Sequence, residues 1–267
     1  FKVGDRVTAA HHVPCNECRY CKRGAHSVCE TLRTTTFYPG GFTEFVRLPE
    51  INVRTGTFKL PETMSFVEGS FSEPLGCVVR AMRVADFQKG SSVLVIGSGI
   101  SGILHIKLAR ALGASHITAV DISDDRLRLA KDFGADLVLK ASEDIRAKLV
   151  ESPGGLADFV AICAGADSAI ETALNCVDRG GAILFFAPKA PGETYPMPLF
   201  DLWRDNITLV NSYASPPVDT LKAIALIGEG KVTVEDMVTH RLSLDEAAEG
   251  FKLVAGGTDS LKVVIEP

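Results

Sequence analysis

Residues 91–121, with the sequence SSVLVIGSGISGILHIKLARALGASHITAVD, constrain the fold more than any other stretch of this chain. The apolar run from Ser92 to Ile96 suits a strand that is buried on both faces, and apolar residues then recur with helical spacing from Ile100 to Ala111. A second strand-like run follows at His116–Val120. This order of strand, helix and strand predicts a βαβ unit and therefore a parallel sheet.

Three glycines, Gly97, Gly99 and Gly102, lie between the first predicted strand and the helix and form a GxGxxG pattern. Gly97 allows the tight turn, Gly99 lets the backbone approach a pyrophosphate, and Gly102 lets the helix pack close to the strand. The free N–H groups at the helix N-terminus attract an anion, and we expect Ser101 in this turn to contact the cofactor. The pattern alone is a weak signal, but its position between strand and helix predicts a dinucleotide site.

Asp121 follows Gly102 by nineteen positions, at the end of the second strand. A carboxylate at this point is expected to accept hydrogen bonds from both hydroxyls of the adenosine ribose. It repels a 2′-phosphate, and the next residues, Ile122 and Ser123, supply no arginine to receive one, so the predicted cofactor is NAD rather than NADP. Arg126 either lies against the adenosine or is an ordinary exposed helical arginine.

The same alternation of strands and helices continues along the chain and predicts an α/β fold, with a doubly wound parallel sheet of six strands in a Rossmann domain. Helical stretches are expected around residues 142–150 and 167–176. After Tyr213 we expect helices at Val218–Ile227 and Leu244–Val254 and a closing strand at residues 261–266. The four further strands of the sheet are predicted at Ala135–Leu139, Asp158–Gly165, Gly181–Ala187 and Ile207–Tyr213.

Four of the seven cysteines, Cys15, Cys18, Cys21 and Cys29, have the spacing CxxCxxCx7C, which lets one tight loop direct four thiolates at a common point. A disulfide framework suits short secreted chains, and a ferredoxin-type iron–sulfur run has its fourth cysteine after three residues and before proline. The spacing therefore favours zinc. Four thiolates leave the metal no open position, so this zinc is predicted to be structural.

Composition excludes some classes of partner. The 267 residues carry a net charge of −5 with no block of lysine or arginine, so we expect neither nucleic acid nor an anionic membrane as a partner. No apolar run approaches the roughly 20 residues needed to span a bilayer, and no signal peptide is recognised, which predicts a cytoplasmic protein. The chain begins at Phe1, within what reads as a β-rich domain, and a missing N-terminal segment is expected.

Several segments, in this order along essentially the whole chain, resemble the zinc-containing medium-chain dehydrogenases, and the likeness is nearest to the branch of sorbitol, threonine and related alcohol dehydrogenases. It implies a GroES-like catalytic domain at residues 1–76 and 214–267, N-terminally incomplete, around a Rossmann NAD-binding domain at residues 77–213. It also implies a homodimer or homotetramer built largely through the Rossmann sheets. The segments are GDRV, the cysteine loop, GGFTEFVRLP (40–49), SEPLGC (72–77), VLVIGSGISG, VDISDDRLRLAKDFGAD and THRLSLDEAAEGF.

The resemblance also implies a second, catalytic zinc, which acts as a Lewis acid on the substrate oxygen during hydride transfer to the nicotinamide. Family members take its ligands from an early cysteine or aspartate, from a GHE motif, and from the position that matches Glu73. This sequence contains no His-Glu dipeptide, so part of the catalytic zinc site is expected to be lacking. Glu73 is the catalytic and metal-ligand candidate, the alternative being a carboxylate that only stabilises a helix start.

Other groups near this predicted site are weaker candidates. Cys77 could share a helical face with Glu73. His11 and His12 are adjacent, and in an extended segment their side chains would point to opposite sides, so at most one could face the substrate.

The predicted function is the NAD-dependent oxidation of a secondary alcohol or polyol by a zinc-containing dehydrogenase. Ser212 stands before Tyr213, where polyol-oxidising members have arginine, which weakens a sorbitol-type assignment. One alternative is a zinc-free quinone reductase that uses NADPH, although the cysteine loop and Asp121 argue against it. Another is a non-catalytic NAD-binding or zinc-stabilised oligomerisation protein.

Overall fold

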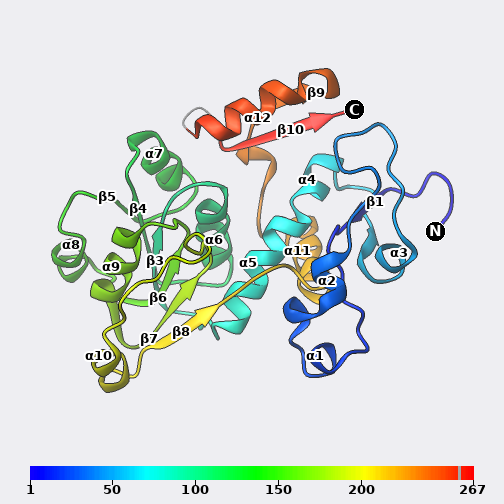
Figure 1. The fold of residues 1–267 in the computed structure, drawn as a ribbon. Helices are drawn as coiled ribbons and strands as arrows, with labels where there is room; N and C mark the ends of the chain where they lie inside the picture. Colours follow the sequence, from blue (N-terminus) through cyan, green and yellow to red (C-terminus); the bar gives the residue numbers. More distant parts are fainter. Residues whose placement is uncertain (258–259) are drawn as a thin grey trace. The chain divides into compact units, whose positions relative to one another are not determined.

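A computed structural model describes residues 1–257 and 260–267, and the chain divides into two compact units (Figure 1). The first unit comprises residues 1–80 and 213–267, and the second comprises residues 81–212. The second unit is therefore inserted between two parts of the first. Among the described residues, no helix has the length and apolar character that crossing a membrane requires.

The second unit is built around one parallel sheet of six strands, in the order β5-β4-β3-β6-β7-β8. In Figure 1 the strands lie side by side with helices around them. The predicted six-stranded parallel sheet is thus confirmed. The strands are β3 (Ser92–Ile96), β4 (His116–Asp121), β5 (Leu137–Lys140), β6 (Ala157–Ile162), β7 (Val177–Phe185) and β8 (Thr208–Asn211).

Some element boundaries differ from the predicted ones for local reasons. β7 begins earlier than predicted, because Val177 already pairs with Ala157 of β6 before the register between the two strands shifts. α8 begins at Ile145 rather than at Ser142, because the side chain of Asp144 accepts a hydrogen bond from the backbone N–H of Ala147 and caps the helix.

The helices of the second unit pack on the sheet in two groups. α6 contacts β3 and β4, and α7 contacts β4 and β5, whereas α9 contacts β6, β7 and α8. Each half of the sheet thus has its own group of helices, as a doubly wound fold requires. The helices are α6 (Ile100–Ala111), α7 (Asp124–Asp132), α8 (Ile145–Glu151), α9 (Asp167–Cys176) and α10 (Leu199–Arg204).

β3 lies in the middle of the sheet, and all five of its residues are buried. Leu94 and Ile96 belong to the apolar cluster formed with α8 and α9, and Val95 between them approaches Gly102 of α6 on the opposite face. Burying each such side chain contributes about 1.5–3 kcal/mol. A strand with apolar residues on both faces can be stable only at the centre of a sheet covered on both sides.

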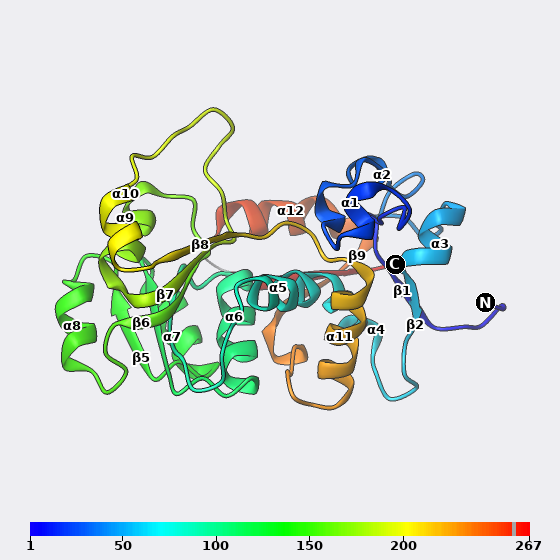
Figure 2. The same ribbon diagram turned by 90° about the horizontal axis from the view of Figure 1, so that it is seen from below.

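The strand order reverses direction between β3 and β6. The segments that follow these two neighbouring strands therefore leave the sheet side by side, at its carboxyl end. Gly97 follows β3 and Cys163 follows β6, and the carboxyl ends of parallel strands at such a switch point form the ligand crevice of doubly wound folds. The segment 186–198 between β7 and α10 forms a long loop (Figure 2). Lys189 in this loop forms an ion pair with Asp167 at the start of α9.

The first unit contains short strands in two pairs. β1 (Val7–Ala9) and β2 (Thr57–Lys59) are antiparallel, whereas β9 (Val238–Ser243) and β10 (Lys262–Glu266) are parallel. α12 packs on β9 and β10. The predicted helix 244–254 is divided into η3 and α12, and the predicted closing strand is β10. The last helix before the second unit is α5 (Ser72–Val84), whose residues 81–84 already belong to that unit. The other helices are α1 (Arg19–Lys22), η1 (His26–Val28), α2 (Glu30–Thr34), α3 (Glu50–Gly56), α4 (Phe66–Ser70), α11 (Pro217–Gly228), η2 (Glu235–Met237), η3 (Leu244–Glu246) and α12 (Ala247–Gly256).

The segment that leads into the cysteine loop is held by a buried amide. Asn52 of α3 is fully buried, and its Nδ2 donates to the carbonyl oxygens of Ala10 at 2.9 Å and His11 at 3.0 Å. Thr35, just after α2, accepts from the N–H of Val13 through its side-chain oxygen at 3.0 Å. Asn52 thus holds the backbone just before the loop, and Thr35 ties the segment just after the loop to Val13.

Candidate functional site

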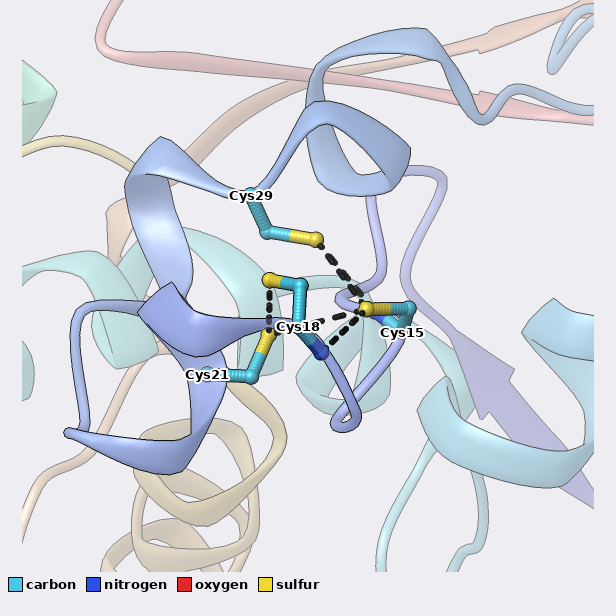
Figure 3. Close-up of side chains that lie close together, drawn as sticks. All are labelled: Cys15, Cys18, Cys21 and Cys29. Atoms are coloured by element: carbon cyan, nitrogen blue, oxygen red, sulfur yellow. Dashed lines mark hydrogen bonds between the residues drawn. The ribbon is translucent and has the colours of Figure 1, made fainter.

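The four cysteines of the predicted zinc loop come together, with all sulfur atoms within 4.8 Å of one another (Figure 3). The Sγ–Sγ distances are 3.6 Å for Cys18 and Cys21, 3.6 Å for Cys15 and Cys29, and 4.0 Å for Cys15 and Cys21. A tetrahedral zinc ion with bonds of about 2.3 Å requires sulfur atoms about 3.8 Å apart. The donor set and its dimensions therefore fit zinc.

Backbone N–H groups point at several of these sulfurs, among them Cys15 and Cys29. Cys15 Sγ accepts from the N–H of Glu17 at 3.4 Å and of Cys18 at 3.3 Å, which lowers the pKa of Cys15. Burial opposes ionisation of Cys29, but N–H donors from Cys15 and Leu32 outweigh it and lower the pKa of Cys29 to about 6. Burial and the neighbouring Cys18 raise the pKa of Cys21 to about 12. Binding of a metal would therefore release a proton from Cys21.

The cysteine loop packs as a small core of its own. Cys21, Cys29 and Leu32 are buried together, and Ala214 packs against them. Since four thiolates close the coordination shell, a zinc ion held here would stabilise the loop and would offer no position to a substrate.

The predicted glycine turn has the geometry that its sequence pattern demands. Gly97 has a φ of 95°, in the region that side chains rarely allow. A Cβ on Gly102 would lie 1.9 Å from the carbonyl oxygen of Gly97, so only glycine permits α6 to start so close to the turn. A Cβ on Gly99 would meet nothing within 4 Å, so the backbone there is open to a ligand. Ser101 lies in the first turn of α6.

Asp121 ends β4 and reaches back to the glycine turn. Its Oδ2 accepts from the N–H of Ser98 at 2.6 Å, and its Oδ1 accepts from the N–H of Ser123 at 2.9 Å. Each carboxylate oxygen has two acceptor positions, so one on each remains for a ribose hydroxyl. Arg126 stands in the first turn of α7, three residues after the cap Ser123. Its contact with an adenosine stays a prediction.

A histidine that the sequence did not single out lies under the glycine turn. His105 of α6 is fully buried, and its Nδ1 is 2.8 Å from the carbonyl oxygen of Ser101. Burial lowers the pKa of His105 to about 4, although the contact with Ser101 opposes this shift. The ring is therefore neutral at physiological pH.

Glu73 stands in the first turn of α5 and has three titratable neighbours in the first unit. Cys77, one helical turn later, donates its S–H to Glu73 Oε1 at 3.2 Å, so the two share a helical face as predicted. Burial and His12 lower the pKa of His11, and Glu73 opposes this shift. Burial also lowers the pKa of Lys262 on β10, again against the effect of Glu73.

The expectation that His11 and His12 point to opposite sides is wrong. Their ring centroids are 4.0 Å apart. The backbone bends here instead of continuing the extended conformation of β1, so both rings fall on one side. His12 Nδ1 lies 2.8 Å from the carbonyl oxygen of Thr35, and His11 is the one whose charge interacts with Glu73.

The described residues do not assemble the second, catalytic zinc site. Within residues 1–257 and 260–267, the cysteine cluster is the one group of three or more histidine, cysteine and acidic side chains whose donor atoms converge for a metal. Glu73 therefore lacks converging partner ligands in this part of the chain, and the side chains around it do not by themselves fit a catalytic zinc ion.

Sequence patterns could not have found Lys262 as a neighbour of Glu73, and they offered His11 only as one of two adjacent candidates. His11 and Lys262 lie on segments far apart in the chain, and only the packing of the first unit brings them near α5. For His105 a signal existed: a histidine stands within an otherwise apolar helical face, three residues after the last glycine of the turn.

Comparison with known proteins agrees with this geometry. The chain matches the family described as "Alcohol dehydrogenase GroES-like domain" over residues 1–62 and the one described as "Zinc-binding dehydrogenase" over residues 101–229. A protein named "Probable D-xylulose reductase A", from Aspergillus clavatus, is 33% identical over 268 residues, which cover 96% of this chain and 72% of that protein. The chain belongs to the zinc-containing medium-chain dehydrogenases.

Solved structures of zinc-binding dehydrogenases have the same fold. An alcohol dehydrogenase from Thermus sp. ATN1 superposes with a TM-score of 0.87 at 27% identity, over 100% of this chain and 77% of that one. A zinc-binding dehydrogenase from Sinorhizobium meliloti 1021, bound to NADP, gives a TM-score of 0.88 at 25% identity, over 100% of this chain and 78% of that one. The fold predicted from the sequence, Rossmann with a GroES-like domain, is therefore confirmed.

Replacing one cysteine of the loop should release its metal. We expect Cys29→Ser to weaken zinc binding by more than about 100-fold, because even changes outside the ligand shell cost about 10- to 100-fold. Zinc per chain after dialysis, measured by elemental analysis, should fall from one to near zero. Cys176→Ala removes a cysteine outside the cluster and should retain the zinc; equal zinc in both variants would contradict the assignment.

The buried His105 should make this dehydrogenase sensitive to acid. Above pH 6.5 the ring is neutral in both states, whereas between that pH and about 4 only the unfolded chain takes up the proton, so stability falls as the pH falls. Between about pH 7 and pH 4.5, His105 alone lowers the free energy of unfolding by about 2.5 kcal/mol. Urea unfolding of His105→Leu should show a correspondingly flatter pH dependence than the wild type. His240→Leu is the control for removing a histidine, and identical slopes for His105→Leu and the wild type would contradict the prediction.

Proposed function

We propose that this chain is an NAD-dependent oxidoreductase that transfers a hydride between a secondary alcohol or polyol and the nicotinamide. The balanced reaction is CHOH + NAD⁺ giving C=O + NADH + H⁺. The observation that carries the proposal is the contact of Asp121 with Ser98, because it joins an acceptor for a ribose diol to a pyrophosphate-binding turn in one crevice.

The residues of the second unit account for cofactor binding in this proposal. The turn at Gly97 and Gly99 brings the backbone close to the pyrophosphate, and the first N–H groups of α6, including that of Ser101, receive its charge. Asp121 is already oriented by two backbone N–H groups, so no rearrangement is needed before it accepts the ribose hydroxyls. The bound NAD supplies the hydride-accepting ring.

The charge around the ribose position favours NAD. Asp121 ends β4 where a 2′-phosphate would add negative charge, whereas Asp124 and Asp125 at the start of α7 are paired with Lys140 and Arg128. The Sinorhizobium relative is bound to NADP, so the preference of this chain rests on its own Asp121 rather than on the family.

The substrate class is proposed as a small alcohol or polyol. The Aspergillus relative is named as a D-xylulose reductase and the Thermus relative as an alcohol dehydrogenase, which supports this class. Glu73, which accepts the S–H of Cys77, is our candidate for the catalytic carboxylate and for one ligand of a metal whose other ligands the described residues do not supply. Ser212 before Tyr213 argues against a sorbitol-type pocket.

The two halves of the proposed reaction are assigned to different domains. We assign residues 77–213 to NAD binding and residues 1–76 with 214–267 to the catalytic domain, close to the bounds of the two compact units. A cytoplasmic location belongs to the same proposal, and the cysteine loop supports it, because its four thiols must stay reduced to bind a metal.

A second candidate is an NAD-binding protein without dehydrogenase activity. It is favoured by one observation: among the described residues no further side chains converge with Glu73 on a metal. The two functions differ in a single measurement, the appearance of NADH absorbance with a panel of secondary alcohols and polyols. Reduction of NAD⁺ by any of them excludes the second candidate.

We also propose that two copies associate along β8. This strand is the last of the sheet, so its outer edge pairs with no other strand of the described chain. The preceding helix α10 exposes Leu199, Phe200 and Trp203, the last with 77% of its surface accessible. An open edge beside exposed aromatic side chains favours association between copies.

Removing the carboxylate should weaken cofactor binding. In Asp121→Asn the ribose loses a charged acceptor, so the Kd for NADH should rise about 10- to 100-fold, and the preference over NADPH should shrink. Titration of NADH fluorescence measures both values. Asp132→Asn, at the far end of α7, makes the same charge change and should bind as the wild type does. Wild-type chain that binds neither NADH nor NAD⁺ at millimolar concentration would refute the proposed function.

A charge on α10 should separate the copies. We expect the wild type to be a dimer or larger at tens of micromolar and Trp203→Glu to be a monomer, because the carboxylate would have to be buried without a partner. Light scattering coupled to size-exclusion chromatography gives the mass directly. Val150→Glu, on the exposed side of α8, is the matched control and should leave the mass unchanged. A monomeric wild type would contradict association through β8.

A further inference from the structure

We propose that His105 is a positioning residue for cofactor binding, whose ring holds the first turn of α6 in the geometry that receives the pyrophosphate. The inference rests on the proposed NAD-binding function and adds a residue that no sequence motif contains. Its support is a set of contacts that one buried ring makes with the start of α6 and with two strand ends.

The first contact runs along the helix. His105 Nδ1 lies 2.8 Å from the carbonyl oxygen of Ser101, one turn earlier. A carbonyl oxygen only accepts, so Nδ1 carries the proton and donates, which fixes the tautomer of the ring. Ser101 thus receives a side-chain donor in the turn whose N–H groups face the anion.

This hydrogen bond also acts through the peptide group. The carbonyl of Ser101 and the N–H of Gly102 belong to the same peptide unit, and a donor on the carbonyl polarises that N–H. The N–H of Gly102 is among the first of α6, which have no partner within the helix. A stronger and more rigid N–H donor at Gly102 favours the binding of a phosphate oxygen.

The ring also contacts the ends of two strands. Cys163 Sγ, directly after β6, lies 3.5 Å from His105 Nδ1, and the ring of Phe186, directly after β7, meets the imidazole edge-on with 4.7 Å between centroids. The backbone of Cys163 also lies next to the glycine turn, since a Cβ on Gly97 would be 3.1 Å from it. His105 therefore lies between the start of α6 and the strand ends that form the crevice.

The ring has an unfavourable feature that packing alone does not explain. His105 Nε2 is buried and has no hydrogen-bond partner among the described residues. Leaving such an acceptor unsatisfied costs roughly 1–3 kcal/mol, and leucine would fill a similar volume at no such cost. A side chain that lowers stability beside a ligand crevice indicates a role in the site.

The test compares two substitutions in the full chain. Since His105→Leu removes the donor and the unsatisfied acceptor, the Kd for NADH should rise about 10-fold while the urea midpoint at pH 7.5 stays equal or rises. His105→Asn places an amide N–H where Nδ1 was, so its Kd should return to within about threefold of the wild type. NADH fluorescence and urea unfolding supply the two readouts.

Leu108→Ala, at a fully buried position further along α6, is the control for damage to the helix. It should lower the urea midpoint and leave the Kd for NADH unchanged. The inference would be overturned, and the proposed function left intact, by either of two results. One is that His105→Leu binds NADH with the wild-type Kd; the other is that the Kd of His105→Asn is as high as that of His105→Leu. A wild type that fails to bind NADH would overturn both.

Discussion

The start of α6 against the end of β3 is the contact on which the second unit depends. The Gly97 carbonyl oxygen occupies the space where a side chain on Gly102 would have to begin, so the chain can reverse from strand to helix within a few residues only because both positions are glycine. This tight reversal returns α6 to the sheet, directs its N-terminus at the switch point and lets Asp121 reach the turn from the next strand.

The two candidate sites of this dehydrogenase are built in different ways. The cofactor crevice is formed by regular elements, and its shape follows from strand order and helix packing. The cysteine loop has only short helices, so its conformation depends on four sulfurs meeting at one point. Asn52 of α3 holds the backbone just before the loop, and Thr35 ties the segment just after it to Val13. A metal ion here replaces the hydrophobic core that so short a segment cannot build.

Much of this arrangement could be predicted because it is local. GxGxxG, the following acidic residue and CxxCxxCx7C each encode a geometry within a short stretch of chain, and the structure brings together the side chains that these patterns selected. The remaining features depend on packing over long sequence distances. Lys262 reaches the vicinity of Glu73 from the last strand, and a bend after β1 turns both His11 and His12 to one side, neither of which periodicity can reveal.

The geometry of the thiol loop has a consequence for handling the protein. Cys15 and Cys29 both ionise more readily than ordinary cysteines, and their sulfurs are 3.6 Å apart. Without a bound cation, air can oxidise one thiolate of the pair to a sulfenic acid, and the other sulfur is close enough to displace water from it and form a disulfide. Chelators and oxygen together would therefore trap the loop as a disulfide, and the bound ion also serves as a protecting group for its own ligands.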